Sequence, residues 1–419
     1  MTRCAALRRV TWVALAALGG CFSGEEPLPP HEALAKAAQR SDTILQEEGA
    51  RSRDAVPLEP PETPPDPGTV SFWYYTHPLA GPFMASRERW AGNHSPPTVL
   101  ETQFIGEWNY AIEKLTVSLA AGDLPDMAMV KRGWLARLVA SGRIVPLDTV
   151  LLPSLIDDIR VPSREAFVVG GRLYALPADG FCSVLYYNRT LVKEAPKDWE
   201  GLRRLARDVK RAGGGTANAA YPLGDLPFLE MLWSVGGTVC DEKKSGLASP
   251  EAFEALDFIL SLRDEGLIHP HALGAPDSAF ELFIAGKVAM TVASSQYTAR
   301  ARSAPFPVGM APPPGKSGPV AMLSDNAIVV FARYAAAKRL EIGAVADFLT
   351  GPEVQGAEAA DLGSVPTRAS VARDVPSAEG LAQAYDHARN TPLVGPWSEI
   401  EFELMRYLNL AFQYKPKIP

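Results

Sequence analysis

The sequence predicts an α/β protein built of two lobes. Strand-like and helix-like segments alternate from Thr69 to the end of the chain, a pattern typical of sheets covered by helices. With 419 residues, the chain is longer than a protein that folds around a single hydrophobic core. The third observation is the stretch from Gly170 to Arg189, in which two short apolar strands flank an irregular connector. We interpret these as a strand that ends one lobe and a strand that begins the next, rather than as a hairpin.

Composition and motif content exclude several classes of function. The formal net charge is −7, and loss of Arg3, Arg8 and Arg9 with the N-terminal segment would bring it to −10. A net acidic chain without clustered lysine or arginine argues against a nucleic-acid partner. The sequence contains no HExxH, GxSxG or metal-like Cys/His spacing. We therefore predict no enzyme activity, no metal and no cofactor.

The N-terminus has the form of a targeting segment. Three arginines precede the apolar run Val10 to Leu18, which is too short to span a bilayer. The run ends in Leu18-Gly19-Gly20-Cys21, which resembles the lipobox of bacterial lipoproteins. This resemblance implies a signal peptide over residues 1–20 and lipidation of Cys21. The protein would then be an extracytoplasmic, membrane-anchored lipoprotein, in the periplasm or on the outer face of the cell membrane.

Residues 21–67 read as a proline-rich tether. Prolines cluster at both ends, and a weakly amphipathic helical run extends from His31 to Gly49 between them. Such a composition predicts an extended spacer that does not bury a core. Of the cysteines beyond it, Cys182 and Cys240 are compatible equally with one disulfide and with two buried thiols.

The elements follow in order from Thr69. A strand over 69–75 is rich in aromatic residues, the region 98–104 is a second candidate strand, and 127–130 is a short buried strand. The helical spacings before the central stretch cover 108–121 and 134–142, the latter ending at a glycine.

After the central strands at 173–176 and 183–187, the helical signals become stronger. Ser249 as N-cap and Pro250 at the first position open an amphipathic helix that extends to Glu265. A strand is predicted over 287–292. The other predicted helices are 198–211, 228–240, 280–286, 341–350 and 398–412.

Several short motifs lie along the chain at Ala121–Asp126, Gly142–Asp148, Gly171–Pro177, Tyr186–Arg189, Gly236–Gly237, Phe283–Met290 and Gly363–Arg368. In their order and spacing they resemble the family 1 extracellular solute-binding proteins of ABC importers, the group that includes the maltose-binding protein. Each motif alone is weak, but their order over nearly the whole mature domain is specific. Asp126 in the first of them is expected to be structural.

The resemblance implies a type II periplasmic-binding-protein fold, with a ligand cleft between two lobes and three hinge crossovers. The crossovers would lie near Ala178–Phe181, Arg302–Phe306 and Thr350–Glu353. The N-lobe would comprise residues 68–178 and 304–351, and the C-lobe residues 179–303 and 352–419. Closure of the lobes about such hinges would enclose a ligand.

A sugar presents flat C–H faces and many hydroxyls, so its site needs aromatic platforms and polar side chains that each form several hydrogen bonds. The candidates lie where strands end at the expected cleft, and at positions where the resembled family often places aromatics. They are Trp73, Tyr75, Arg132, Trp134, Asp179, Phe181, Trp233, Tyr297, Asp325, Asn326 and Trp397. We expect about half of the aromatic candidates to be core packing instead.

The resemblance implies a monomeric receptor that binds a solute, expected to be a mono- or oligosaccharide, and delivers it to the transmembrane permease subunits of an ABC transporter. Where the maltose-binding pattern has a glutamate near the first crossover, this chain has Phe181. That departure argues against malto-oligosaccharides while leaving a sugar. The alternatives on the same scaffold are a receptor for a non-sugar solute and a sensory ligand-binding lipoprotein.

Overall fold

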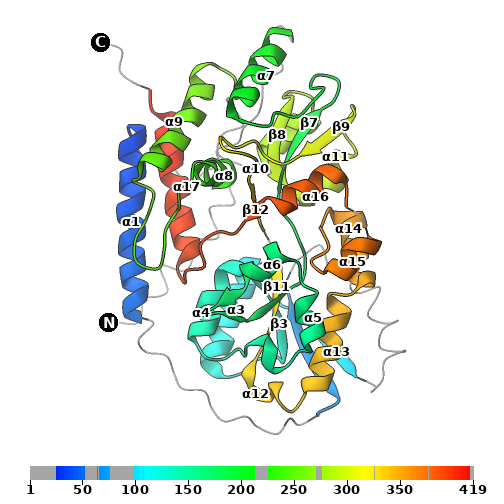
Figure 1. Ribbon diagram of the computed structural model, residues 1–419. Coiled ribbons are helices and arrows are strands. Elements are labelled where there is room, and N and C mark those ends of the chain that lie inside the picture. Colours follow the sequence, from blue (N-terminus) through cyan, green and yellow to red (C-terminus); the bar gives the residue numbers. More distant parts are fainter. Residues whose placement is uncertain are drawn as a thin grey trace.

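The computed structural model describes residues 25–51, 64, 66–75, 98–106, 108–212, 225–269, 276–324, 326–375 and 377–415. Within these residues, two sheets form the centres of two lobes, the first lower and the second upper in Figure 1. The predicted two-lobed α/β fold is therefore confirmed.

The first sheet has the strand order β2-β1-β3-β11-β6. β1 pairs in parallel with β2 and β3, whereas β11 is antiparallel to both β3 and β6. The strand bounds are β1 Thr69–Tyr74, β2 Val99–Phe104, β3 Met127–Lys131, β6 Ala175–Pro177 and β11 Asn326–Val330. The central strands are almost wholly buried, which explains their continuous apolar sequences.

The second sheet has the order β8-β7-β9, with β7 (Ser183–Asn188) antiparallel to β8 (Met290–Ser294) and β9 (Val308–Ala311). The chain passes from β6 in the first sheet to β7 in the second through residues 178–182. The first crossing therefore lies where the sequence predicts it. Two smaller pairs, β4–β5 (Val168–Val169, Arg172–Leu173) and β10–β12 (Ala321–Met322, Ala388–Arg389), lie outside the main sheets.

The chain returns to the first sheet later than predicted. Because β9 pairs with β7, the chain still belongs to the second sheet at Ala311, and only β11 rejoins β3 and β6. The predicted crossing near Arg302 to Phe306 is therefore wrong, and the crossing lies between β9 and β11. A four-residue strand followed by three consecutive prolines is too short to show an alternating pattern.

Helices cover each sheet. Those of the first lobe are α3 Trp108–Ala121, η3 Arg132–Trp134, α4 Leu135–Ala140, η4 Leu147–Thr149, α5 Pro153–Asp157, α6 Val161–Ala166, α12 Ala332–Ala335 and α13 Arg339–Leu349. Those that follow β7 are α7 Trp199–Ala212, α8 Asp225–Ser234, α9 Pro250–Asp264, α10 Pro276–Ile284, η6 Ser295–Tyr297 and α11 Thr298–Ala301. As predicted, the Ser249 side chain caps α9 by accepting a hydrogen bond from the Ala252 amide.

The C-terminal third contains α14 Pro352–Leu362, α15 Ala369–Asp374, α16 Glu379–Asp386 and α17 Trp397–Gln413. α13 packs on β1 of the first sheet, and α14 packs on both α13 and α11. The chain therefore reaches the second lobe just after α13, close to the third predicted crossing. Since β9 belongs to the second sheet, the predicted start of the returning N-lobe segment at residue 304 shifts toward β11, and the other lobe boundaries stay predictions.

The N-terminal helix α1 (Pro30–Arg51) is part of the folded body, contrary to the predicted tether. It packs along α17 and also contacts α9. α1 and α17 lie side by side at the left of Figure 1. One face of α1 is buried through Ala33, Leu34, Ala37 and Leu45. Small alanines allow close packing of two helices while lowering apparent amphipathicity, so the sequence pattern underestimates this face.

Two further expectations are settled by burial. Cys182 and Cys240 are both buried free thiols. Asp126 is structural, as predicted, because it accepts hydrogen bonds from the amide and hydroxyl of Ser71 and pairs with Lys338 at 3.0 Å. In the part of the chain that the structure describes, none of the helices has both the length and the apolar character needed to cross a bilayer.

Candidate functional site

A buried hydrogen-bond network joins the first crossing to the end of the first sheet. Asn326, at the start of β11, donates its amide to one oxygen of Asp179 at 2.9 Å and its side-chain NH₂ to the other at 2.8 Å. The Tyr75 hydroxyl, just after β1, donates to the Asn326 side-chain oxygen. Burial, and then the nearby Asp179, hold the pKa of Tyr75 well above 10. The network therefore fixes the geometry at the point where the chain leaves the lobe.

Aromatic side chains gather beside this network. The ring of Trp134 lies 5.6 Å from that of Tyr75, between centroids, at an angle of 53°. Trp397 begins α17 and lies against η3, since a Cβ added to Gly133 would be 3.4 Å from its indole. Rings and amides on neighbouring elements are the combination expected of a carbohydrate site.

Arg132 connects this region to the C-terminal segment. Its Nε donates to the Ala166 carbonyl at 2.8 Å, and its Nη1 donates to the Thr391 carbonyl and, at 3.2 Å, to the Thr391 hydroxyl. The guanidinium therefore already joins η3 to residues far along the chain.

A second carboxyl group lies near Asp179. Glu358 on α14 and Asp179 are both 0% exposed. Among the described residues, neither oxygen of Glu358 has a hydrogen-bond partner. Burial, and then the charge of Asp179, raise the pKa of Glu358 well above 4.5. The first crossing is thus lined by two buried acids, and the pKa of one of them, Glu358, is raised.

The sequence candidates fall into two groups. Tyr75, Trp134, Asp179, Asn326, Arg132 and Trp397 lie around the network just described. The others are packed elsewhere in the fold or lie outside the described residues. Trp73 packs under Lys114, Tyr297 stacks on Phe280 at 4.5 Å, and Phe181 is buried.

The remaining candidates are placed as follows. Trp233 is buried on α8, and its carbonyl accepts a hydrogen bond from Arg389 at 3.3 Å. Asp325 and Cys21 lie outside the described residues. All eleven ligand contacts stay predictions.

A set of contacts between α6 and α16 was not predicted from the sequence. Arg160, which precedes α6, pairs with Asp386 at 2.7 Å and lies over the ring of Tyr385 at 4.4 Å. The Tyr385 hydroxyl hydrogen-bonds Ser163. Because α6 packs on β6 and α16 packs on β7 and β9, these contacts join the two lobes. Both helices are short and have no clear hydrophobic period, so the sequence pattern did not indicate these contacts.

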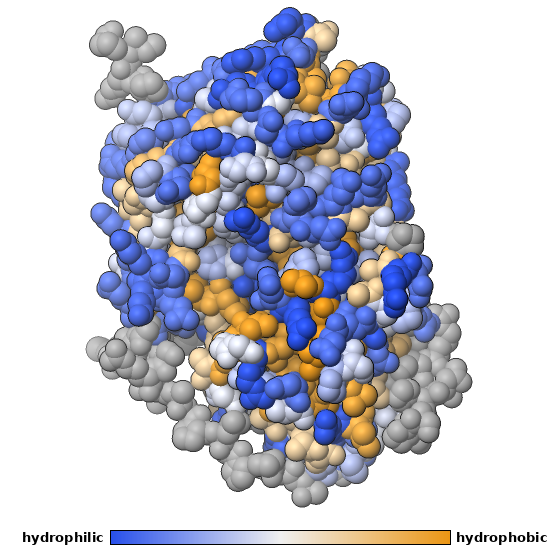
Figure 2. Space-filling view, viewed as in Figure 1, coloured by the Kyte–Doolittle hydropathy of each residue, from blue (hydrophilic) through white to orange (hydrophobic). Residues whose placement is uncertain are grey.

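Apolar side chains are exposed on the surface of the first lobe in this area. Figure 2 shows hydrophobic side chains spread over the part of that lobe that turns toward the viewer. Leu152, before α5, is 65% exposed and Val161, at the start of α6, is 63% exposed. Apolar surface beside the lobe contacts is compatible with a ligand that has apolar faces.

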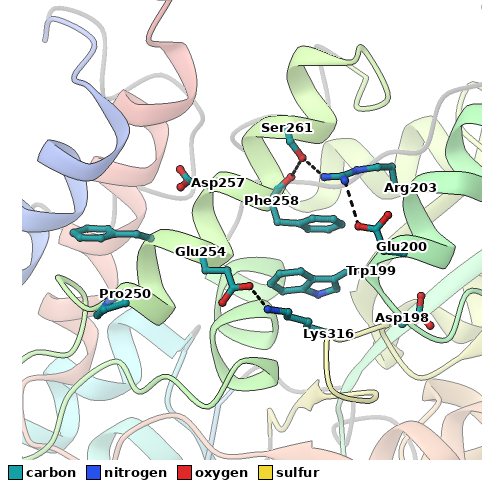
Figure 3. A pocket seen from close by; sticks show the side chains of 11 residues that line it. Asp198, Trp199, Glu200, Arg203, Pro250, Glu254, Asp257, Phe258, Ser261 and Lys316 are labelled. Carbon is teal, nitrogen blue, oxygen red and sulfur yellow. Dashed lines mark hydrogen bonds and ion pairs between the residues drawn. The ribbon is translucent and has the colours of Figure 1, made fainter.

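A separate pocket of about 890 Å³ lies on the second lobe, between α7, α9 and Lys316. Figure 3 shows Trp199 stacked on Phe258, with ring centroids 4.4 Å apart, and Lys316 paired with Glu254. A second ion pair on its wall joins Glu200 to Arg203 at 3.2 Å. The lining carries four carboxylates against two cations, so the pocket is net acidic, and it includes none of the residues of the network at the first crossing.

Comparison with known proteins agrees with this architecture. A sequence profile described as bacterial extracellular solute-binding protein matches residues 96–356. A binding protein of Brucella abortus is 28% identical over 229 residues, which are 51% of this chain and 54% of that protein. The maltotriose-binding protein of Pyrococcus abyssi is 25% identical over 292 residues, 66% of this chain and 63% of that protein. The chain thus matches about half to two thirds of the length of these relatives.

Among solved structures, the sugar-binding protein MalE of Xanthomonas citri superposes with a TM-score of 0.70 at 21% identity, covering 81% of this chain and 92% of that one. The maltotriose-binding protein of Thermus thermophilus gives 0.62 at 20% identity, covering 81% and 99%. Two α/β lobes joined by crossing segments define the periplasmic-binding-protein class. The chain belongs to the bacterial extracellular solute-binding protein family.

Proposed function

We propose that this protein is an extracytoplasmic receptor that binds a saccharide between its lobes and delivers it to the permease of an ABC transporter. The observation that carries the proposal is the group of Tyr75, Trp134, Asp179 and Asn326 at the first crossing. It combines ring faces with amide and carboxylate groups where a hinge must act. The family is one of binding proteins, so no catalytic step is required.

The names of the relatives support a saccharide as ligand. They include the maltotriose-binding protein of Pyrococcus abyssi and a maltooligosaccharide ABC transporter lipoprotein of Streptococcus pneumoniae, 30% identical over 107 residues. Phe181 in place of the expected glutamate is fully buried, so malto-oligosaccharides and unrelated sugars both belong in the first test. A lipid at Cys21 would hold the receptor at a membrane.

The test is calorimetric titration of the soluble mature chain, with Cys21 replaced by serine, against mono- and oligosaccharides. The chain must retain α1, because α1 is part of the folded body. We expect one saccharide to bind, and at a hundredfold excess over its Kd to stabilise the fold by about 2.7 kcal/mol.

Two tryptophan variants locate the site. Trp134 and Trp199 are both buried, but only Trp134 lies at the crossing. Trp134→Ala should weaken binding at least about tenfold, or 1.4 kcal/mol, whereas Trp199→Ala should leave the affinity unchanged. Equal losses in both variants, or silence across the whole panel, would contradict a saccharide site at the crossing.

A further inference from the structure

The folded body begins much closer to Cys21 than the sequence pattern indicates. The carboxylate of Glu25 accepts hydrogen bonds from Arg406 Nε on α17, at 2.9 and 3.1 Å. The Leu28 amide donates to the Leu410 carbonyl at 3.3 Å. The chain is therefore fixed to α17 from Glu25 onward, before α1 begins at Pro30.

Covalent geometry then limits the distance between a lipid on Cys21 and the protein. Four residue steps separate Cys21 from Glu25, and whatever their conformation they reach at most about 14 Å. A free tether over residues 21–67 would reach on the order of 150 Å. An anchor at Cys21 would thus hold the protein at the bilayer rather than away from it.

We propose that the side of the protein formed by α1 and α17 lies against the phospholipid bilayer. The proposal rests on the proposed lipidation of Cys21. The short segment begins beside Arg406, in the middle of α17, so the anchor is attached to this side. Figure 1 places α13 and α14 on the opposite side of the molecule, which then faces away from the lipid.

Both lobes share this side, because α1 contacts each of them. Near its start, His31 bonds to Asp257 on α9 at 2.9 Å. Near its end, Glu48 pairs with Arg137 on α4 at 3.0 Å. The receptor would therefore lie with both lobes at similar height above the bilayer, so that a membrane partner meets the two lobes together.

The described lysine and arginine side chains of α1 and α17 are each paired with a carboxylate, so attraction to anionic lipid is not what orients this side. Lys36 pairs with Glu32 at 2.8 Å, and Arg40 approaches Glu403 to 3.5 Å. A juxtamembrane surface that depends on anionic lipid instead carries a cluster of unpaired lysine and arginine. The orientation should therefore be the same on neutral and on anionic vesicles.

The experiment compares two single-cysteine labels in the lipidated full-length protein on phosphatidylcholine vesicles. Gln39 on α1 is exposed, and Leu340 on α13 is 74% exposed. Cys182 and Cys240 are buried, so a dye added to Gln39→Cys or Leu340→Cys labels that position. A quencher on the lipid headgroups should quench the dye at position 39 more than the dye at position 340.

The matched control lengthens the attachment. An insert of about 20 glycine and serine residues between Gly24 and Glu25 allows a mean reach of roughly 25 Å, and should remove the difference between the two positions. Equal quenching without the insert, or a difference that survives it, overturns the proposal. An intact mass that shows no lipid at Cys21 overturns the proposal as well. Saccharide titration of the same protein reports separately on the proposed function.

Discussion

Glu358 offers a sharp test of the buried acid pair at the first crossing. Its side chain is 0% exposed, and neither oxygen has a hydrogen-bond partner among the described residues. A buried polar group without a partner costs about 1–3 kcal/mol of folding free energy. Glu358→Met removes both oxygens in a flexible side chain of similar length, so it should raise the free energy of unfolding by about that amount.

The gain should depend on pH. Burial and Asp179 raise the pKa of Glu358 in the folded protein above its ordinary 4.5, so the folded state keeps a proton that the unfolded state has lost. The stability that Glu358 contributes is complete below its pKa in the unfolded chain. It falls as pH rises toward the higher pKa that Glu358 has in the folded protein. The advantage of Glu358→Met over the native chain should therefore be larger at pH 8 than at pH 4.

Urea unfolding of both proteins at the two pH values measures this. Glu358→Gln is the control, since it removes the titration but leaves an unpartnered amide, and should flatten the pH dependence with a smaller gain. A methionine variant that is no more stable than the native chain at pH 8, or whose gain is the same at both pH values, would refute the reasoning.

Three further outcomes follow from local geometry. Lys338→Met leaves Asp126 buried without its cation and should cost about 3–5 kcal/mol in urea unfolding, so a loss under 1 kcal/mol would contradict a buried pair. Gly363 has φ of 68°, and an added Cβ would lie 2.3 Å from the Ser295 carbonyl, so Gly363→Ala should lower the melting temperature clearly. Burial raises the pKa of Cys240 to about 12, so a thiol reagent at pH 8 should modify it only in urea, and rapid reaction in buffer would be inconsistent with this environment.

The first crossing could be predicted from the sequence because its signal is local. Two strands of buried residues flank Ala178 to Phe181, and no regular element accommodates that connector. The hydrogen bonds that this connector forms could not be predicted in the same way. Asp179 and Asn326 are far apart in the chain, and their contact at 2.8 Å depends on β11 entering beside β6, which no spacing in the sequence specifies.

The failures have a common physical origin in tertiary packing. The helical run at His31 was predicted correctly as a helix but incorrectly as a tether, because its apolar face consists largely of alanines that become useful only against α17. Likewise, β9 is defined by its pairing with β7 and not by its own four residues. Partners remote in sequence determine both elements.

The packing of α1 on α17 also has a consequence for the order of folding. α1 makes most of its contacts with α17 and fewer with α9, so most of its apolar face stays uncovered until the last helix of the chain has formed. Bringing together two helices from opposite ends of the chain costs conformational entropy and slows folding. During synthesis, the native structure is completed only when the C-terminal helix has emerged. A chain that is passed through a membrane in an unfolded form benefits from this delay, because its final closure takes place only after the whole polypeptide has crossed.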